Sequence, residues 1–271
     1  MSEYIEDEDF WGMEEEIDEY EKSAEEEIME FFEKNKENVF FSRQIEVIFE
    51  QKYFHWVSNR AIRSLVASKR IQSESREIAG GIRIHLLWHR NYRYYKRDAK
   101  AIVKLVEEYA APSVAGSIGI HGELIVLEGF ARFQYVLMGR SVNGFKGKQW
   151  NKSNHNLDFI FYKDGISYGV EVKNTLGYME YKELQLKIEM CRELGIRPVF
   201  VSRMMPKTWI HQIGSAGGFA LILKYQLYPL SHKNLAERVA KRLKLPVDSP
   251  RSIEDGTMKR FENWHNKVKM K

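Results

Sequence analysis

Cysteine is nearly absent from this sequence: Cys191 is the only one among 271 residues. A single thiol excludes an intrachain disulfide and a zinc site built from several cysteines. The sequence also lacks a phosphate-binding loop, a dinucleotide-binding glycine motif and a nucleophile elbow. These absences argue against nucleotide-cofactor and serine-hydrolase chemistry and favour a reducing, intracellular location.

Long apolar runs are lacking as well. The longest, residues 218–223, is far too short to cross a bilayer. The acidic start of the sequence has neither the basic nor the apolar region of a signal peptide. We therefore expect no membrane partner and a cytoplasmic location.

Basic residues are scarce at the start and abundant elsewhere. Residues 1–33 hold sixteen Asp or Glu against the single Lys22, a net charge of −15, whereas the other residues hold 41 Lys or Arg and 22 Asp or Glu, a net charge of +19. A basic body favours a nucleic-acid partner, because neutralising phosphates dominates such affinity. Residues 1–29 are expected to form an acidic, disordered tail, although a helix over residues 21–32 is an alternative. The tail acts either as a solubility device or as a competitor of DNA for the basic surface.

Residues 30–92 are typical of two short helices followed by a β-hairpin. Ser42 and Ser58 are candidate N-caps of the helices, and the strands 71–78 and 82–88 flank an Ala-Gly-Gly turn. This order resembles a winged-helix domain, which implies DNA contact or, alternatively, docking of a protein. The expected nucleic-acid contacts in this region are Asn59, Arg60, Arg63, Lys69, Arg76, Arg83 and Arg90. A linker helix over residues 93–115 follows, and Pro112 marks the expected domain boundary.

Residues 157–173 indicate a tight β-hairpin. The Asp164-Gly165 pair separates two β-prone runs, and a type I′ turn favours this dipeptide because both central positions need positive φ. With this pair at the tip, Asp158 lies opposite Glu171. Alternation of side chains then predicts one core-facing side, made of Leu157, Phe159, Phe161, Tyr168, Val170 and Val172.

The other side of the hairpin carries Asp158, Glu171 and Lys173. Two carboxylates directly opposite on a ladder repel each other unless a cation lies between them. Magnesium prefers such oxygen ligands and is typically held by one or two carboxylates together with substrate phosphate. Lys173 is placed to orient or deprotonate an attacking water, or to neutralise charge that develops on a phosphodiester. The alternative without a catalytic role is a solvated hairpin face with an ordinary Glu–Lys pair.

An Asp on one strand and Glu171-Val172-Lys173 on the next resemble the signature of the PD-(D/E)xK nuclease superfamily. The resemblance implies an α-β-β-β-α-β core over residues 116–230 in a mixed α/β fold. After it, Ser231 is a candidate cap, and the basic residues that follow predict a basic helical extension over residues 231–271. The resemblance also implies that a helical Glu completes the metal site and places Val172 with the metal-holding residues. Glu123 is favoured because Gly119-x-x-x-Glu123-Leu-Ile is similar to the start of that helix in archaeal Holliday junction resolvases.

Glu128 is the alternative helical acid. It lies five positions after Glu123 and so on another face of the helix, which predicts that only one of the two faces the metal. Gln185 is a further candidate for facing the site from the helix after the hairpin, with an ordinary surface glutamine as the alternative. The basic stretch before the hairpin supplies the remaining expected nucleic-acid contacts, which are Arg140, Lys146, Lys148 and Lys152.

The sequence therefore predicts a Mg²⁺- or Mn²⁺-dependent DNA endonuclease that acts in repair, recombination or restriction. Its expected partner is duplex or branched DNA, which would associate the protein with the nucleoid, and a homodimer is a possible assembly. One alternative is a winged-helix regulator whose nuclease-like domain binds DNA without cleaving it. A second alternative is an RNA-processing endonuclease.

Overall fold

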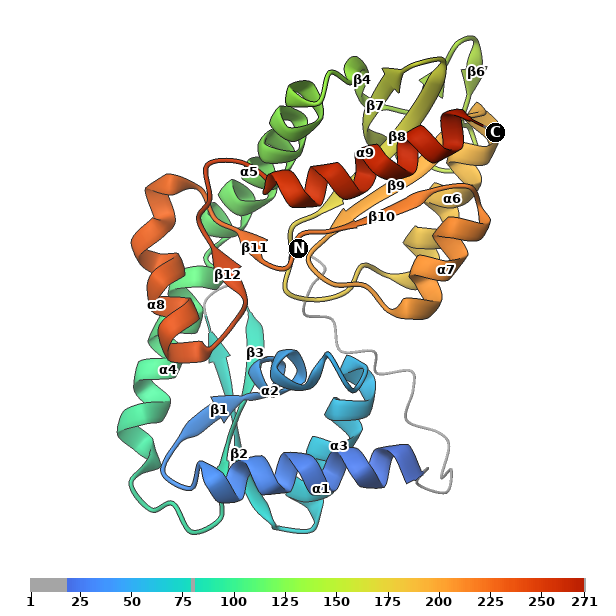
Figure 1. Cartoon of the computed structure of the whole chain (residues 1–271). Helices are drawn as coiled ribbons and strands as arrows, with labels where there is room; N and C mark the ends of the chain where they lie inside the picture. The colour runs from blue at the N-terminus through green and yellow to red at the C-terminus, as the bar shows by residue number, and fades with distance from the viewer. Residues whose placement is uncertain (1–18, 79–80, 271) are drawn as a thin grey trace. The chain divides into compact units, whose positions relative to one another are not determined.

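The computed structural model describes residues 19–78 and 81–270 of a mixed α/β chain (Figure 1). Its contacts divide the chain into two units. The first comprises Met1–Ala115 with Glu237–Leu245, and the second comprises Gly116–Ala236 with Pro246–Lys271. The division therefore falls among the small residues that follow Pro112, and a short helical piece from late in the sequence returns to the first unit.

The first unit combines helices with a small antiparallel sheet whose first strand lies between the first two helices in the chain. In chain order its elements are α1 (Glu19–Lys34), β1 (Val39–Phe41), α2 (Ser42–Phe49), α3 (His55–Ala67), β2 (Ile71–Ile78), β3 (Ile82–His89) and α4 (Tyr95–Ala110), and most of α8 (Lys233–Leu243) joins them. The strands lie in the order β1-β3-β2. The predicted pair of helices and hairpin are thus present, preceded by a helix and a short strand.

Helix α1 forms part of the core of the first unit. It buries Ala24, Ile28 and Phe32 in one cluster with Leu65 of α3. The boundary expected at residue 29 therefore falls within a helix, because the apolar residues that follow the acidic ones recur at helical spacing and need a partner. The rest of the expected disordered tail, residues 1–18, lies outside the described residues.

Neither expected N-cap is the cap residue in the structure. Helix α2 begins at Ser42, but its N-cap is Phe41, whose backbone N–H donates to Gln44. Helix α3 begins at His55, so Ser58 lies inside the helix and is buried. The prediction for Ser58 was wrong because the apolar stripe of α3 extends one turn toward the N-terminus, to His55 and Val57.

The second unit is built on a five-stranded sheet in the order β10-β9-β8-β7-β4. Its main elements in chain order are α5 (Pro112–Arg132), β4 (Val136–Val142), β7 (Leu157–Lys163), β8 (Ile166–Lys173), α6 (Tyr181–Leu194), β9 (Arg197–Ser202), α7 (Lys207–Ser215), β10 (Phe219–Ile222) and α9 (Asp255–Lys269). Strands β4, β7 and β8 are antiparallel neighbours, whereas β9 and β10 run parallel to β8. Helix, three strands, helix and strand therefore follow one another, with the short pair β5 (Gly144–Phe145) and β6 (Lys148–Gln149) inserted after β4.

The hairpin β7–β8 has the predicted register. Lys163 pairs with Ile166 and the ladder continues to Phe159 opposite Val170, one step before Asp158 and Glu171. Asp164 and Gly165 have φ values of +50° and +82° at the tip. The turn was readable because few dipeptides accept two left-handed residues.

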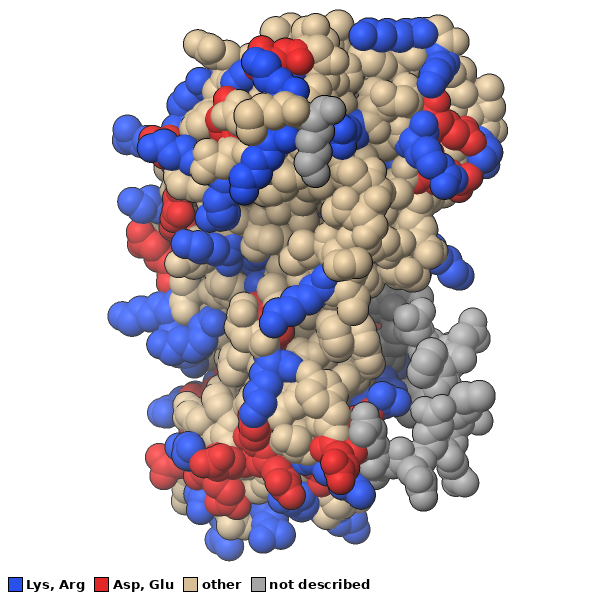
Figure 2. All heavy atoms as spheres, turned by 45° about the vertical axis from the view of Figure 1, so that its right-hand side comes forward, with Lys and Arg blue, Asp and Glu red and all other residues tan. Residues whose placement is uncertain are grey.

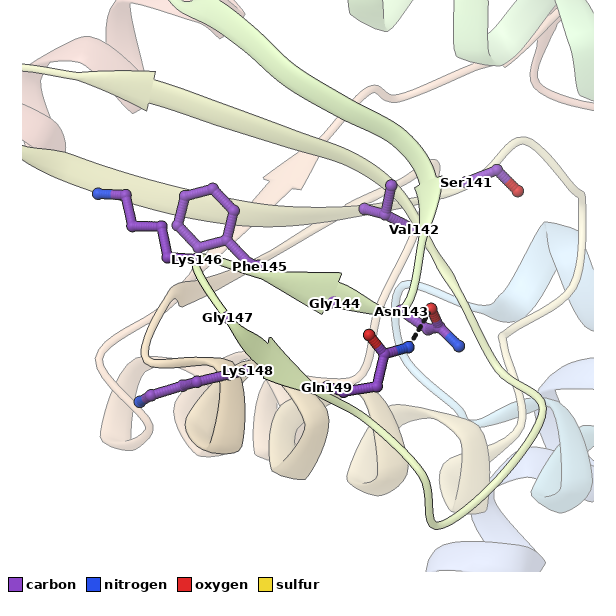
Figure 3. A pocket seen from close by; sticks show the side chains of 9 residues that line it. All are labelled: Ser141, Val142, Asn143, Gly144, Phe145, Lys146, Gly147, Lys148 and Gln149. Carbon is purple, nitrogen blue, oxygen red and sulfur yellow. Dashed lines mark hydrogen bonds between the residues drawn. The ribbon is translucent and has the colours of Figure 1, made fainter.

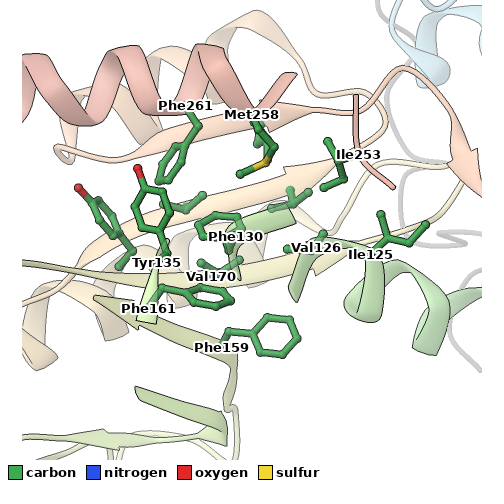
Figure 4. Packing of buried hydrophobic residues seen from close by; sticks show 14 of the residues in the cluster. Ile125, Val126, Phe130, Tyr135, Phe159, Phe161, Val170, Ile253, Met258 and Phe261 are labelled. Carbon is green, nitrogen blue, oxygen red and sulfur yellow. The ribbon is translucent and has the colours of Figure 1, made fainter. Parts of the chain in front are cut away.

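Aromatic side chains fill the core on one side of this hairpin (Figure 4). Phe130 of α5 stacks on Phe161 of β7 with ring centroids 4.4 Å apart, and Phe261 of α9 packs against Phe130 at 5.1 Å. The C-terminal segment expected as a basic extension is therefore, through α9, a layer of this core. Helix α5 is also long and apolar enough by composition to cross a membrane, and its Ile125, Val126 and Phe130 belong to the same core.

Leu157 is the exception to the predicted core face. It packs with Ile160 and Cys191 in a second cluster under α6. A Cβ placed on Gly169 would lie 2.9 Å from the Leu157 side chain, so Leu157 fills the space that this glycine leaves. The alternation fails at Leu157 because it is the first residue of β7, beyond the end of the β7–β8 ladder.

Candidate active site

The two strand carboxylates meet where the hairpin β7–β8 passes under α6. Asp158 lies one residue into β7, and its Oδ2 accepts a hydrogen bond of 2.7 Å from the backbone N–H of Val172 on β8. Glu171 precedes Val172 and is only 5% exposed. The side chain of Asp158 thus crosses to β8 and occupies the neighbourhood of Glu171, as the register predicted.

Lys187 of α6 is the cation that the structure adds to this pair. Its Nζ lies 2.6 Å from Oε2 of Glu171, and it also donates to the backbone carbonyl of Asn156. Lys187 is 4% exposed. It was missed in the sequence because it sits among the buried apolar residues of α6, where a charged residue of an amphipathic helix is not expected.

Burial dominates the electrostatics of both carboxylates. Burial, followed by the charge of Asp158, raises the pKa of Glu171 to about 7, against the opposing effect of Lys187. Burial also raises the pKa of Asp158, with a further contribution from the charge of Glu123, while the Val172 N–H lowers it. The protein therefore holds two acids in a state that favours a proton or another cation.

Lys173 ends β8 beside these acids. Its Nζ lies 2.8 Å from Oε1 of Glu183 on α6 and 3.7 Å from Oε1 of Glu171. Burial by itself lowers the pKa of Lys173, but the hydrogen bond to Glu183 and the neighbouring carboxylates outweigh it and raise the pKa. A lysine in this state remains protonated at neutral pH, which favours charge neutralisation over deprotonation of water as its role.

Glu123 of α5 is near this cluster without joining it. Its Oε2 pairs with Arg140 of β4 at 2.9 Å, yet its charge contributes to the raised pKa of Asp158. Within residues 19–78 and 81–270, no three acidic, histidine or cysteine side chains converge as a set able to hold a metal ion. The structure therefore brings together Asp158 and Glu171 and leaves Glu123 in an ion pair at the margin.

The position of α5 relative to β8 depends on Asn174, which directly follows Lys173. The amide of Asn174 donates to the carbonyls of Ile118 and Leu227 at 2.8 and 2.7 Å, and its Oδ1 accepts from the Leu227 N–H at 2.7 Å. Gly122 faces it so closely that a Cβ there would lie 2.6 Å from the Asn174 Cβ. The glycine that matters for this helix is thus Gly122, the neighbour of Glu123. The sequence alone could not have identified Gly122, because its close approach to Asn174 depends on how α5 packs.

The other candidates lie apart from the carboxylates or touch them through the backbone. Glu128 is exposed and pairs with Arg132 one turn along α5 at 3.1 Å. Gln185 is exposed on α6, as expected for an ordinary surface glutamine. Val172 contributes its backbone N–H to Asp158. Of the two helical acids, Glu123 is the one whose charge reaches the site.

Several of the expected nucleic-acid contacts in the first unit are engaged by acids. Asn59 donates to Glu46 at 2.9 Å, Arg60 pairs with Glu21 of α1, and Arg76 pairs with Glu74 at 2.5 Å. The remaining expected contacts are exposed, namely Arg63, Lys69, Arg83 and Arg90. In Figure 2, a group of acidic side chains lies at the height at which Figure 1 shows α1, and smaller acidic groups lie among Lys and Arg elsewhere on this face.

The expected contacts in the second unit divide in the same way. Lys152 pairs with Glu189 and Glu193 of α6, and Arg140 with Glu123. Lys146 and Lys148 are exposed at the tip of the β5–β6 hairpin, which lines an open cavity of about 460 Å³ together with Asn143 and Gln149 (Figure 3). At the end of this hairpin away from its turn, the amide of Gln149 donates a hydrogen bond of 2.7 Å to the amide oxygen of Asn143.

Comparison with known proteins adds little to this geometry. No protein-family description matches the sequence, and no curated protein matches it. Among solved structures, the crystal structure of protein VC1899 from Vibrio cholerae is similar at 14% identity over 85% of this chain and 52% of that chain, with a TM-score of 0.25. The chain thus spans about half the length of that protein, and a likeness this weak carries no argument about fold or function.

Proposed function

We propose that this chain is a Mg²⁺- or Mn²⁺-dependent DNA endonuclease of the PD-(D/E)xK kind. In this proposal the second unit is a restriction-endonuclease-like core made of α5, β4, β7, β8, α6 and β9, and the first unit is a winged helix formed by α1 to β3. The observation that carries the proposal is the meeting of Asp158 and Glu171 at one end of a buried hairpin, with Lys173 beside them.

The donor set suits a hard divalent ion. Asp158 and Glu171 offer carboxylate oxygens, and burial raises the pKa of both, so the site favours added positive charge. Two carboxylates leave the remaining positions of an octahedral ion to water and substrate phosphate, as is usual for magnesium. A divalent ion held there would polarise a phosphodiester and lower the pKa of a bound water.

The chain's own residues supply charge and position. Hydrolysis forms a bond from water oxygen to phosphorus, breaks one phosphorus–oxygen ester bond, and transfers a proton to the departing alkoxide. Lys173, kept protonated by Glu183 and its other neighbours, can donate hydrogen bonds to the phosphoryl oxygens as negative charge increases there. Asp158 is fixed by the Val172 N–H, which donates to its Oδ2 and leaves its second oxygen without this bond.

The first unit supports DNA as the substrate of the proposed nuclease. A helix, a short strand, two helices and a β-hairpin is the order of elements in winged-helix modules, and Arg63 and Lys69 of this unit are exposed on or directly after α3. The body of the chain carries a net charge of +19 beyond residue 33. Such a surface binds phosphate backbones irrespective of sequence, which leaves RNA as the competing substrate.

The burial of Asp158 and Glu171 argues against the alternative of a regulator that binds DNA without cleaving it. A domain that only binds DNA gains nothing from two buried acids, since each one in its ionised form weakens attraction for phosphate. The rival is nonetheless separable by experiment, because it predicts DNA binding without any product.

The test is a cleavage assay with purified protein on linear, nicked, flapped and four-way DNA and on a matched RNA duplex. We expect product on at least one DNA substrate with Mg²⁺ or Mn²⁺ and none with chelator. Glu171→Gln, which keeps the shape of the side chain and removes its charge, should bind the same DNA without cutting it. DNA bound by the wild type but intact under every metal condition would favour the regulator, and product from RNA alone would favour the RNA-processing enzyme.

A further inference from the structure

Lys187 occupies a position that a soluble helix normally gives to an apolar residue. The buried side of α6 consists of Leu184, Met190, Cys191 and Leu194, and Lys187 lies on the same stripe. Taking an ammonium group into such a place is expensive, and exchanging a buried ion pair for apolar residues is often neutral or stabilising. Stability of the fold alone therefore gives no reason for a lysine here.

The contacts of Lys187 indicate what the ammonium does. One donor is bound to Glu171 at 2.6 Å and another to the carbonyl of Asn156, the residue two places before Asp158. The group thus lies among the oxygen atoms at the start of β7 and the end of β8. One of them, Oε2 of Glu171, is a carboxylate oxygen that a divalent ion would need.

The charge balance of the buried cluster also indicates that Lys187 and a divalent ion compete for the same carboxylates. When both are ionised, as a bound metal requires, Asp158 and Glu171 bring two negative charges, of which Lys187 balances one. Lys173 is already balanced by Glu183 at 2.8 Å, and Glu123 by Arg140 at 2.9 Å. A divalent ion added with Lys187 still in place would leave an excess positive charge in the interior, whereas its departure would leave the cluster neutral.

We propose that Lys187 is a resident counter-ion of the metal-free site, which a divalent metal displaces from Glu171 when it binds. This inference rests on the proposed function, because it concerns the same pair of carboxylates. Lys187 is in this view a positioning residue: it keeps Asp158 and Glu171 together before metal arrives and sets the metal concentration at which the site is loaded.

The test compares Mn²⁺ binding by the wild type and by Lys187→Met, in the full chain without DNA. Methionine has a similar length and suits the apolar stripe, and it has no charge that competes with metal. We expect Lys187→Met to bind Mn²⁺ about tenfold or more tightly by titration calorimetry and to show a larger Mn²⁺-induced rise in melting temperature. Lys182→Met, an exposed position on the same helix, is the matched control and should bind Mn²⁺ as the wild type does.

The outcomes separate this inference from the proposed function. Equal or weaker Mn²⁺ binding by Lys187→Met, with normal binding by the wild type, overturns the role of Lys187 and leaves the nuclease proposal intact. Absence of Mn²⁺ binding by both proteins overturns the metal site and, with it, this inference.

A second measurement needs no variant and decides the matter if Lys187→Met does not fold. The wild type is treated briefly with acetic anhydride, with chelator or with excess Mn²⁺, and acetylation at each lysine is measured by peptide mass spectrometry. We expect Lys187 to be protected in chelator and to become several-fold more reactive with Mn²⁺, while Lys182 reacts equally in both. Unchanged protection of Lys187 with Mn²⁺ bound overturns the displacement.

Discussion

Opposing electrostatic effects act on Glu171, and the proposed chemistry depends on their balance. Its carboxylate is almost fully buried, lies near a second acid and is approached by Lys187 and Lys173. Burial outweighs both lysines, so the pKa of Glu171 is raised to about 7 rather than lowered. Near neutral pH the site therefore exists in two states, and a divalent ion would stabilise the ionised one.

The raised pKa predicts how the metal-free protein responds to pH. A carboxyl whose folded pKa lies above its unfolded value binds its proton more tightly when folded. Its stabilising contribution is present below about pH 4.5 and is lost as the pH rises through about 7. In chelator, the free energy of unfolding by urea should fall from pH 5.5 to pH 8 more steeply for the wild type than for Glu171→Gln, by on the order of 1 kcal/mol for each unit of difference in pKa. Parallel pH profiles for the two proteins would contradict this electrostatic description.

Asp158 offers a test of the paired acids with effects of opposite sign. Asp158→Asn retains an oxygen for the Val172 N–H and removes one of two repelling charges, so in chelator it should stabilise the protein by about 0.2–1 kcal/mol. Excess Mn²⁺ should raise the melting temperature of the wild type, since it binds only the folded state, and should do much less for the variant. A variant that melts lower in chelator and still gains the full Mn²⁺ shift would disprove the paired-acid metal site.

At this scale the sequence predicted Asp158, Glu171 and Lys173 because a hairpin register needs only the turn and the alternation of side chains. Lys187 and Glu183 could not be predicted in the same way. They reach the site from α6, and which face of a helix covers which strand depends on packing between segments distant in sequence. Glu123 was placed on the correct helix, yet its ion pair with Arg140 joins α5 to β4, and such a pair follows from the packing of elements.

Helix α5 depends on one close approach. Gly122 lets the helix lie against Asn174, which in turn binds the backbone of both α5 and β11 (Gln226–Leu227). This contact connects the end of β8, where Lys173 stands, with the helix that carries Glu123. The helix itself was predictable from its apolar composition. Residues 93–115 were expected to form one linker helix, whereas α4 ends at Ala110 and α5 begins at Pro112.

Two glycine substitutions on α5 separate this contact from helix propensity. Gly122→Ala would bring a methyl group to 2.6 Å from the Asn174 Cβ, so it should destabilise the protein by about 1–3 kcal/mol. Gly119→Ala meets no atom within 4 Å and should stabilise the helix by up to about 1 kcal/mol. Urea unfolding of both variants measures the difference. Equal stabilisation by the two alanines would mean that α5 does not rely on this approach.

For the whole molecule, charge is distributed unevenly along the chain. Residues 1–18 contain nine acidic residues and no basic ones, and α1 continues the acidic stretch into a helix whose Glu21 and Glu25 pair with Arg60 and Arg70. The composition made the acidic start evident. It did not reveal that part of this charge is paired with Arg60 of α3 and with Arg70 shortly after it, because such ion pairs follow from the fold.

A truncation tests whether the acidic start competes with DNA. Removing residues 1–18 keeps α1, with its buried Ala24, Ile28 and Phe32, and removes nine negative charges. A tethered polyanion competes with phosphate at high effective concentration, so the truncated protein should bind duplex DNA several-fold more tightly at low salt. The advantage should vanish at high salt. Equal affinities at low salt would assign these residues to solubility alone.

The most direct test of the central claim is single-turnover cleavage by Lys173→Ala, with DNA affinity measured on the same preparation. One lysine among 42 basic residues contributes little to phosphate binding, but Lys173 stands beside both acids. We predict that the variant loses cleavage by at least about 100-fold, keeps its DNA affinity within a few-fold, and differs in this from Lys182→Ala, which should cut at the rate of the wild type. Cleavage by Lys173→Ala at the wild-type rate would contradict a nuclease site formed by Asp158, Glu171 and Lys173.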